Sequence, residues 1–564
     1  MRILNVLLLV ALMAAAAIMY YGQNANTTFV TVGQRIGSAH SGGAGVGGAP
    51  GRDQWHAAPP NDFNVEEYAR RSDNSFHLAK SEPLSTFSID VDTASYTNVR
   101  RILMQGHLPP KDAVRIEEFV NYFSYVYAAP QGEHPISVST EVARCPWQPQ
   151  HHLVRIGIQG KTIATEEMPP RNLVFLVDTS GSMAGWNRLP LLKKSLALLA
   201  RQLTRRDRVT IVEYAGRAGL VLPTTPGDQH AKILAALERL YAEGSTNGGE
   251  GIQMAYRLAE QSFIKGGANR VILGTDGDFN VGVTGSELIR LVESKRNTGI
   301  YLTVLGFGMD NLKDATMEKL AQHGNGFYAY IDTMAEAQRV FLEKIGTLIP
   351  IANDVKVQVE FNPTQVQAYR LIGYENRLLE HHDFNDDAKD AGDMGAGHTV
   401  TALYEIVPPG VPFKTPNTDA LKYQEKSRLT PQADNKELMS VKVRYLPPGE
   451  KQSRLLTATV TSEDRPFEAA SKDFWFAASV ASFAMLLRQS PHRGETSFAQ
   501  VEQWTKAVIN ADDHPQRREF LHLVQTAQRL VRPNLSDVSN GRVALTKPSR
   551  SQYAGFDQRP RDWQ

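Results

Sequence analysis

Side chains that carry oxygen ligands gather in one short segment near the middle of the chain. Residues 172–183 read Asn-Leu-Val-Phe-Leu-Val-Asp-Thr-Ser-Gly-Ser-Met, an apolar run with the length and β-branching of a buried strand, followed by Asp178, Ser180 and Ser182. A carboxylate and two hydroxyl groups at alternate positions would leave the end of this strand together. Oxygen ligands with a single negative charge suit a hard divalent cation such as Mg²⁺.

Two later segments supply groups that would complete such a site. The glycine-rich loop 244–249 carries Thr246, and a second apolar run, 271–274, is followed by Thr275 and Asp276. The competing interpretation is a polar strand-to-helix turn in which Ser and Asp cap the next helix. Because three separated pieces occur within one α/β pattern, we favour the metal site.

The motif Asp-x-Ser-x-Ser, then a loop threonine, then an aspartate after a later strand, resembles the metal-ion-dependent adhesion site (MIDAS) of von Willebrand factor type A (VWA) domains. The resemblance implies Mg²⁺, or Mn²⁺, as the bound metal. It also implies that one coordination position is left for an acidic residue of a partner protein. By this resemblance the metal ligands are Asp178, Ser180, Ser182, Thr246 and Asp276.

The segment 169–350 around these residues alternates strand and helix patterns. Strands are expected at 173–177, 208–214, 220–222, 271–274, 302–307 and 326–331, and helices at 189–203, 229–241, 251–263, 286–297, 316–323 and 335–348. Such alternation predicts an α/β fold with a doubly wound (Rossmann-like) sheet, and the resemblance implies that this segment is a VWA domain. Ligands of these folds bind at the carboxyl ends of the strands, where Asp178 and Asp276 both fall.

Two further domains are expected beside this one. Residues 65–168 contain helix patterns at 98–106 and 116–127 and alternating strands, which predict a small α+β N-terminal flanking domain. Residues 351–532 first alternate as strands and then form three helix patterns, at 474–488, 498–510 and 516–530. The sequence therefore predicts a β-sandwich-like and helical C-terminal flanking domain.

The two ends of the chain have other compositions. Arg2 precedes an uncharged apolar run, so residues 1–22 are typical of a signal peptide or a signal anchor, and both interpretations stay open. Residues 23–64 have the glycine-rich composition of a flexible linker, and residues 533–564 that of a disordered tail. We expect an exported protein, periplasmic or anchored in the membrane and facing the periplasm or the cell surface.

The resemblance widens over about 65–530. The phrases at 85–96, 109–118, 275–282 and 397–406 are similar to YfbK-type bacterial VWA proteins. That family implies an extra domain on each side of the VWA domain and export to the cell envelope. Family members are often lipoproteins, but this chain has no cysteine near its N-terminus, so lipid attachment is not carried over.

Composition excludes several other classes of function. The net charge is +1, which gives no basic footprint for nucleic acid. The only cysteine is Cys145, so neither an internal disulfide nor a cluster of thiolate metal ligands can form. These exclusions leave open the function that the VWA resemblance implies, a binding protein whose partner contributes an acidic side chain.

A second acidic motif supports a competing function. Asp90 and Asp92 follow an apolar strand pattern. Such a pair could serve an envelope enzyme or enzyme regulator of the glycosyl- or phosphoryl-transfer type. The alternative is a strand end at which Asp92 or Thr93 caps the next helix. A third hypothesis is a structural scaffold stabilised by its metal. Since no nucleophile beside a base is recognisable, we do not expect an enzyme.

Overall fold

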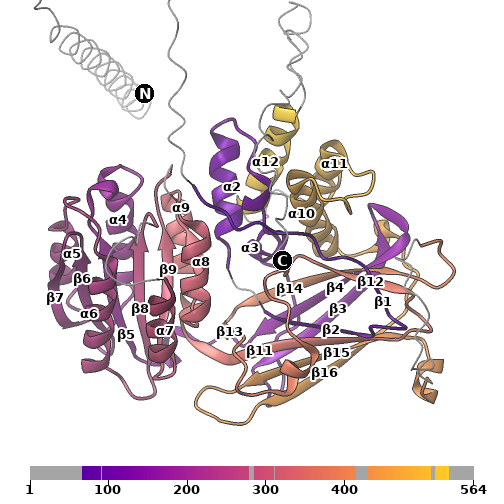
Figure 1. Ribbon diagram of the computed structural model, residues 1–564, viewed down its shortest axis with the longest axis horizontal. Coiled ribbons are helices and arrows are strands. Elements are labelled where there is room, and N and C mark those ends of the chain that lie inside the picture. Colours follow the sequence, from indigo (N-terminus) through magenta and orange to yellow (C-terminus); the bar gives the residue numbers. More distant parts are fainter. Residues whose placement is uncertain are drawn as a thin grey trace, which may run out of the picture. The chain divides into compact units, whose positions relative to one another are not determined.

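The computed structural model describes residues 66–89, 92–277, 285–309, 312–413, 429–509 and 515–531 (Figure 1). The predicted signal segment 1–22, the linker 23–64, Asp90 and the tail 533–564 lie outside these described residues. Within the described ranges, no helix combines the length and the apolar character needed to cross a membrane.

The middle of the chain forms a six-stranded sheet in the order β10-β9-β8-β5-β6-β7. All neighbouring strands are parallel except β7, which runs antiparallel to β6 at one edge. This sheet confirms the predicted doubly wound α/β fold. Its strands are β5 (Arg171–Asp178), β6 (Arg208–Tyr214), β7 (Ala218–Pro226), β8 (Ala268–Thr275), β9 (Ile300–Gly306) and β10 (Tyr328–Tyr330).

Helices cover both faces of this sheet. One face packs against α4 (Leu189–Ala200), α5 (His230–Glu238) and α9 (Met334–Gln338), and the other against α6 (Gly248–Gln261), α7 (Gly285–Arg296) and α8 (Asp314–His323). Helix α6 packs on the sheet because one of its faces is apolar. Its residues at helical spacing, Ile252, Ala255, Tyr256 and Ala259, are all buried. The helix predicted at 335–348 is wrong in its length, because α9 continues as a π-helical turn, Arg339–Glu343, and a 3₁₀ turn, Ile345–Leu348.

The rest of the described chain builds two further sheets. The first has the order β1-β12-β14-β4-β3; the second has the order β13-β11-β15-β16, with β2 also paired to β11. A shared apolar core lies between them. Their strands are β1 (His77–Leu78), β2 (Leu84–Ser88), β3 (Ile136–Cys145), β4 (Gln148–Gly160), β11 (Pro350–Phe361), β12 (Ala368–Ile372), β13 (Gly392–Gly395), β14 (Thr399–Val407), β15 (Glu437–Leu446) and β16 (Arg454–Thr461).

Each sheet of this sandwich combines strands from before and after the VWA domain. Strand β4 pairs with β14, and β2 pairs with β11, in both cases antiparallel. The sequence predicts separate flanking domains at 65–168 and 351–532, whereas in the structure these two segments share both sheets and one core. Alternating polarity predicts a strand but does not specify which strand it pairs with, so the sequence pattern could not show this.

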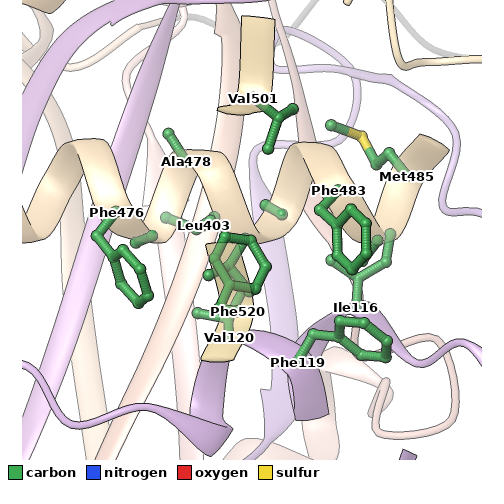
Figure 2. Packing of buried hydrophobic residues seen from close by; sticks show 14 of the residues in the cluster. Ile116, Phe119, Val120, Leu403, Phe476, Ala478, Phe483, Met485, Val501 and Phe520 are labelled. Atoms are coloured by element: carbon green, nitrogen blue, oxygen red, sulfur yellow. The ribbon is translucent and has the colours of Figure 1, made fainter. Parts of the chain in front are cut away.

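A helical layer covers the outer face of the first sheet. It consists of α2 (Ala94–Met104), α3 (Ile116–Tyr122), α10 (Lys472–Arg488), α11 (Phe498–Val508) and α12 (Pro515–Val531). Figure 2 shows Phe476 and Phe483 of α10 packed among Phe119, Leu403 and Phe520. The rings of Phe483 and Phe520 meet edge to face at 5.3 Å, a favoured aromatic arrangement.

Buried ion pairs join the helical layer to the VWA domain. Arg115, which precedes α3, contacts Glu118 in its own helix and Asp314 at the start of α8. Arg100 of α2 contacts Asp332 and Glu336, which lie just before and within α9. Arg115 and Arg100 are buried, and carboxylates of the VWA domain neutralise them. Moving the VWA domain away would leave these charges buried without partners.

A buried acidic pair in the flanking region predicts a pH-dependent stability. Glu375 lies after β12 beside Glu117 of α3, and Arg488 contacts it at 3.0 Å. Burial and then the charge of Glu117 raise the pKa of Glu375 from 4.5 to about 7, against the lowering effect of Arg488. The folded protein therefore holds this proton more tightly than the unfolded chain, and its stability falls as the pH rises from about 4.5 through 7.

We expect Glu375→Gln to stabilise the protein at pH 8 and to have little effect at pH 5. The amide keeps the shape of the side chain but carries no charge that burial would penalise. Thermal unfolding across pH 5–8 measures this, with Glu495→Gln, a change at an exposed position, as the control. Equal effects of Glu375→Gln at both pH values would contradict the assignment.

Candidate metal centre

Three strand ends fix the carboxylate of Asp178. It is the last residue of β5, and the parallel register places it opposite Tyr214 of β6. The Tyr214 hydroxyl donates to Asp178 Oδ2 at 3.1 Å, and the hydroxyl of Thr275, which ends β8, donates to the same oxygen at 2.8 Å. The Ser180 amide donates to Oδ1 at 3.0 Å. The carboxylate is fully buried and held in one orientation.

The two serine hydroxyls of the motif lie next to each other. Ser180 Oγ and Ser182 Oγ are 3.0 Å apart, and Ser182 belongs to a 3₁₀ turn, Gly181–Ala184. Backbone hydrogen bonds attach the loop of Thr246 to this segment: Gly181 N donates to Gly244 O at 3.0 Å, and Glu243 N donates to Thr179 O at 2.8 Å. The loop 244–249, which the sequence predicted to contribute to the site, therefore contacts the segment that carries Asp178, Ser180 and Ser182.

Asp276 follows directly after β8 and is buried. Arg188 Nη1 lies 3.7 Å from Asp276 Oδ2, and the same guanidinium donates to the carbonyl oxygens of Ser182 and Met309. Gly277, next in the chain, has φ +103°, and a Cβ there would lie 2.6 Å from Lys313 N. Only glycine fits this close approach, which fixes the backbone immediately after Asp276.

Four of the five predicted ligands are thus brought together at the carboxyl edge of the sheet: Asp178, Ser180, Ser182 and Asp276. The loop of Thr246 contacts the first segment through Glu243 and Gly244, and within the described residues the Thr246 hydroxyl makes no hydrogen bond with the other four. Sequence reasoning gave no role to Tyr214, Thr275 or Arg188. The position of Thr275 directly before Asp276, and of Tyr214 at the end of the adjacent strand, could have indicated the first two.

The charges at this edge fit a divalent cation. Burial, and in addition the Asp276 carboxylate, raise the pKa of Asp178 to about 6, although hydrogen bonds from Ser180 and Thr275 act in the opposite direction. Two buried carboxylates beside hydroxyl oxygens form a hard donor set. The described residues hold no cluster of three or more His, Cys, Asp or Glu side chains suited to a metal, so any site here depends on its hydroxyl groups.

Asp92, the described member of the second acidic motif, has a different environment. Its Oδ1 accepts from Tyr328 N at 2.6 Å, and its Oδ2 pairs with Arg377 at 2.9 Å. It is buried, and it joins β10 of the VWA domain to the flanking region. Thr93 makes no side-chain capping bond to α2; its hydroxyl accepts from Arg339 at 3.0 Å. These contacts are those of a structural cross-link.

Three stretches of the chain match known families. Residues 172–343 match the von Willebrand factor type A domain, residues 62–155 match a family described as von Willebrand factor, and residues 346–530 match the C-terminal region of uncharacterized protein YfbK. The uncharacterized protein YfbK of Escherichia coli (strain K12) is 42% identical over 481 residues, which cover 84% of this chain and 82% of that protein.

The chain belongs to the YfbK family.

Other matches cover only part of the YfbK-family chain. Inter-alpha-trypsin inhibitor heavy chain H4 of Sus scrofa is 32% identical over 172 residues, 28% of this chain and 18% of that protein. A solved structure, von Willebrand factor type A from Catenulispora acidiphila, is 15% identical with a TM-score of 0.37, over 63% of this chain and 80% of that one. VWA domains commonly mediate protein–protein interactions and often use a MIDAS metal site.

Proposed function

We propose that this YfbK-family chain is a protein-binding module of the cell envelope. Its MIDAS, formed by Asp178, Ser180, Ser182, Thr246 and Asp276, binds Mg²⁺ or Mn²⁺ and recognises an acidic residue of a partner protein. The observation that carries the proposal is the burial of two carboxylates, Asp178 and Asp276, next to two hydroxyls at the carboxyl edge of a VWA sheet. The envelope location rests on the signal or anchor pattern at 1–22.

The residues around the site have two different roles, orienting the carboxylate and supplying oxygen ligands. Tyr214 and Thr275 orient the Asp178 carboxylate before any metal arrives, so little reorganisation accompanies binding. Ser180 and Ser182 offer neutral oxygens, which leave positive charge on a bound divalent ion. That ion, when bound, supplies an electrophilic position for a carboxylate from outside. The serine hydroxyls act as metal donors here: they contact each other, and Ser180 also hydrogen-bonds Asp178, itself one of the proposed ligands.

Affinity capture from an envelope extract tests this function. The protein without residues 1–22 is immobilised in Mg²⁺ and again in EDTA, with Asp178→Ala beside it. We expect a partner to be retained only by wild type in Mg²⁺. The same proteins eluting from all of these columns would overturn the proposal of metal-dependent recognition.

Two aromatic side chains beside the site extend the proposed contact surface. Trp186 is 76% exposed between Ser182 and Arg188, and Tyr241 is 73% exposed just before the loop that carries Thr246. Exposed Trp and Tyr side chains are frequent binding hot spots. We therefore expect Trp186→Ala to weaken partner capture by at least about tenfold, as the loss of a hot-spot side chain does.

The affinity for Mg²⁺ should not change in Trp186→Ala, since no predicted ligand is altered. Phe263→Ala is the matched control, because Phe263 is an exposed aromatic residue at the opposite end of α6 from the loop of Thr246. Capture reduced equally by both changes would show that Trp186 has no specific role.

A further inference from the structure

A cavity unrelated to the predicted metal site lies where three segments meet. Its volume is about 320 Å³, and its walls come from the end of α3, the π-helical turn Arg339–Glu343 with Lys344 after it, and the start of α12. A smaller cavity adjoins it, sharing Arg339 and Lys344 and reaching His398. The charged side chains of the larger cavity are Arg339, Glu343, Lys344 and Arg517.

One of its three cations is not neutralised by a carboxylate. Arg339 pairs with Glu336 at 2.7 Å, and Arg517 pairs with Asp473 at 2.7 Å. Lys344, in contrast, forms no salt bridge within the described residues, and its Nζ donates to Ser124 Oγ at 3.2 Å. An ammonium group has three protons to donate, so Lys344 retains donors for a ligand in the cavity.

The π-helical turn explains why the cations face the same space. Lys344 N donates to Arg339 O at 3.0 Å, which closes the wide turn. Residues five apart lie on different faces of an α-helix, whereas a bond from residue i+5 to residue i aligns them. An ordinary helix across this segment would therefore direct Arg339 and Lys344 to different surroundings. Single π-turns are rare and occur frequently at functional sites.

The neighbouring titratable groups respond to a positive field. Burial, followed by the charge of Arg339, lowers the pKa of Lys344 to about 8, while Glu343 opposes this. Burial, followed by the charges of Lys344 and Arg339, lowers the pKa of His398 to about 3. The first turn of α12, which carries Arg517, also presents the positive end of a helix dipole to the cavity. An anion would relieve this accumulation of positive charge.

We propose that this cavity binds a small dianion that carries a phosphate group, with Lys344 as its principal charge partner and Arg339 and Arg517 as lateral donors. The phosphate group is either free or part of a small phosphomonoester. Because the walls come from α3, from the end of the VWA domain and from α12, a bound dianion would bridge these three segments and stabilise the fold. This inference does not depend on the metal site.

Thermal unfolding of the full chain in EDTA tests the proposal. Inorganic phosphate and glycerol 3-phosphate are titrated separately against chloride at equal ionic strength. Lys344→Met removes the charge and nearly keeps the length of the side chain; Lys319→Met, at an exposed position of α8, is the matched control. Lys344 is half-buried and forms no salt bridge within the described residues, so an apolar side chain of similar length should leave the fold intact.

We expect at least one of the two compounds to raise the unfolding temperature of wild type and of Lys319→Met. Lys344→Met should lose at least about tenfold in affinity for it, as expected when a charged hydrogen-bond donor is removed. The more tightly bound compound identifies the source of the phosphate group. Equal responses of wild type and Lys344→Met, or no response of wild type to either compound, would overturn the proposal.

Discussion

Asp178→Asn is expected to abolish Mg²⁺ binding while making the metal-free protein more stable. The Asp178 carboxylate is buried, and burial raises its pKa to about 6, so its charge destabilises the metal-free fold at neutral pH. Asparagine has the same shape, and its one amide oxygen can still accept hydrogen bonds from Tyr214 and Thr275. The Ser180 amide loses its acceptor, which offsets part of the gain. Changing a residue that only hydrogen-bonds to a metal ligand lowers metal affinity by up to about 100-fold. Losing the charge of a ligand itself should lower the affinity for Mg²⁺ by at least that much.

The two effects have opposite signs and can be measured together. In EDTA we expect Asp178→Asn to unfold at a higher temperature than wild type; in Mg²⁺ only wild type should gain stability. Asp228→Asn, an exposed change in the same domain, should behave as wild type in both conditions. A gain in Mg²⁺ of equal size for wild type and Asp178→Asn would show that the metal binds elsewhere.

Arg115→Met is expected to destabilise the protein by about 3–5 kcal/mol, the usual range when one partner of a buried ion pair is removed. Arg115 is 1% exposed and contacts Glu118 of α3 and Asp314 of α8. Methionine would leave these two carboxylates buried beside an apolar side chain. Because Asp314 belongs to the VWA domain and Arg115 to the helical layer, the loss should also loosen the contact between them.

Denaturant unfolding of Arg115→Met measures this loss, with Arg144→Met as the matched control. Arg144 pairs with Asp464 at 2.8 Å, but the two side chains are 50% and 65% exposed. Water screens such a pair, so its removal should change the free energy of unfolding much less than the loss of Arg115 does. Similar losses for the two variants would contradict the role given to burial.

Local sequence patterns predicted the doubly wound sheet and the strand ends that carry Asp178 and Asp276. Both are encoded within short segments, because an apolar run specifies a buried strand and the residue after it falls at the carboxyl edge. The loop of Thr246 was assigned by resemblance to VWA domains, and the structure places that loop against Thr179 and Gly181 through backbone bonds.

Long-range pairing could not be predicted in this way. The antiparallel pairing of β2 with β11, and of β4 with β14, joins segments separated by the whole VWA domain. Nothing in the alternation of either strand distinguishes one partner from another. The same limit applies to two arginines. Arg115 contacts Asp314 and Arg188 lies beside Asp276, but the sequence does not indicate whether an arginine will pair with a distant carboxylate or remain in solvent.

Crystals of the protein grown with Mn²⁺ test the central claim most directly, through the anomalous scattering of the metal. The account predicts an anomalous peak at the carboxyl edge of the VWA sheet, among the oxygen atoms of Asp178, Ser180, Ser182, Thr246 and Asp276. An anomalous map with no peak there, while Mn²⁺ is bound at another position or not at all, would contradict it.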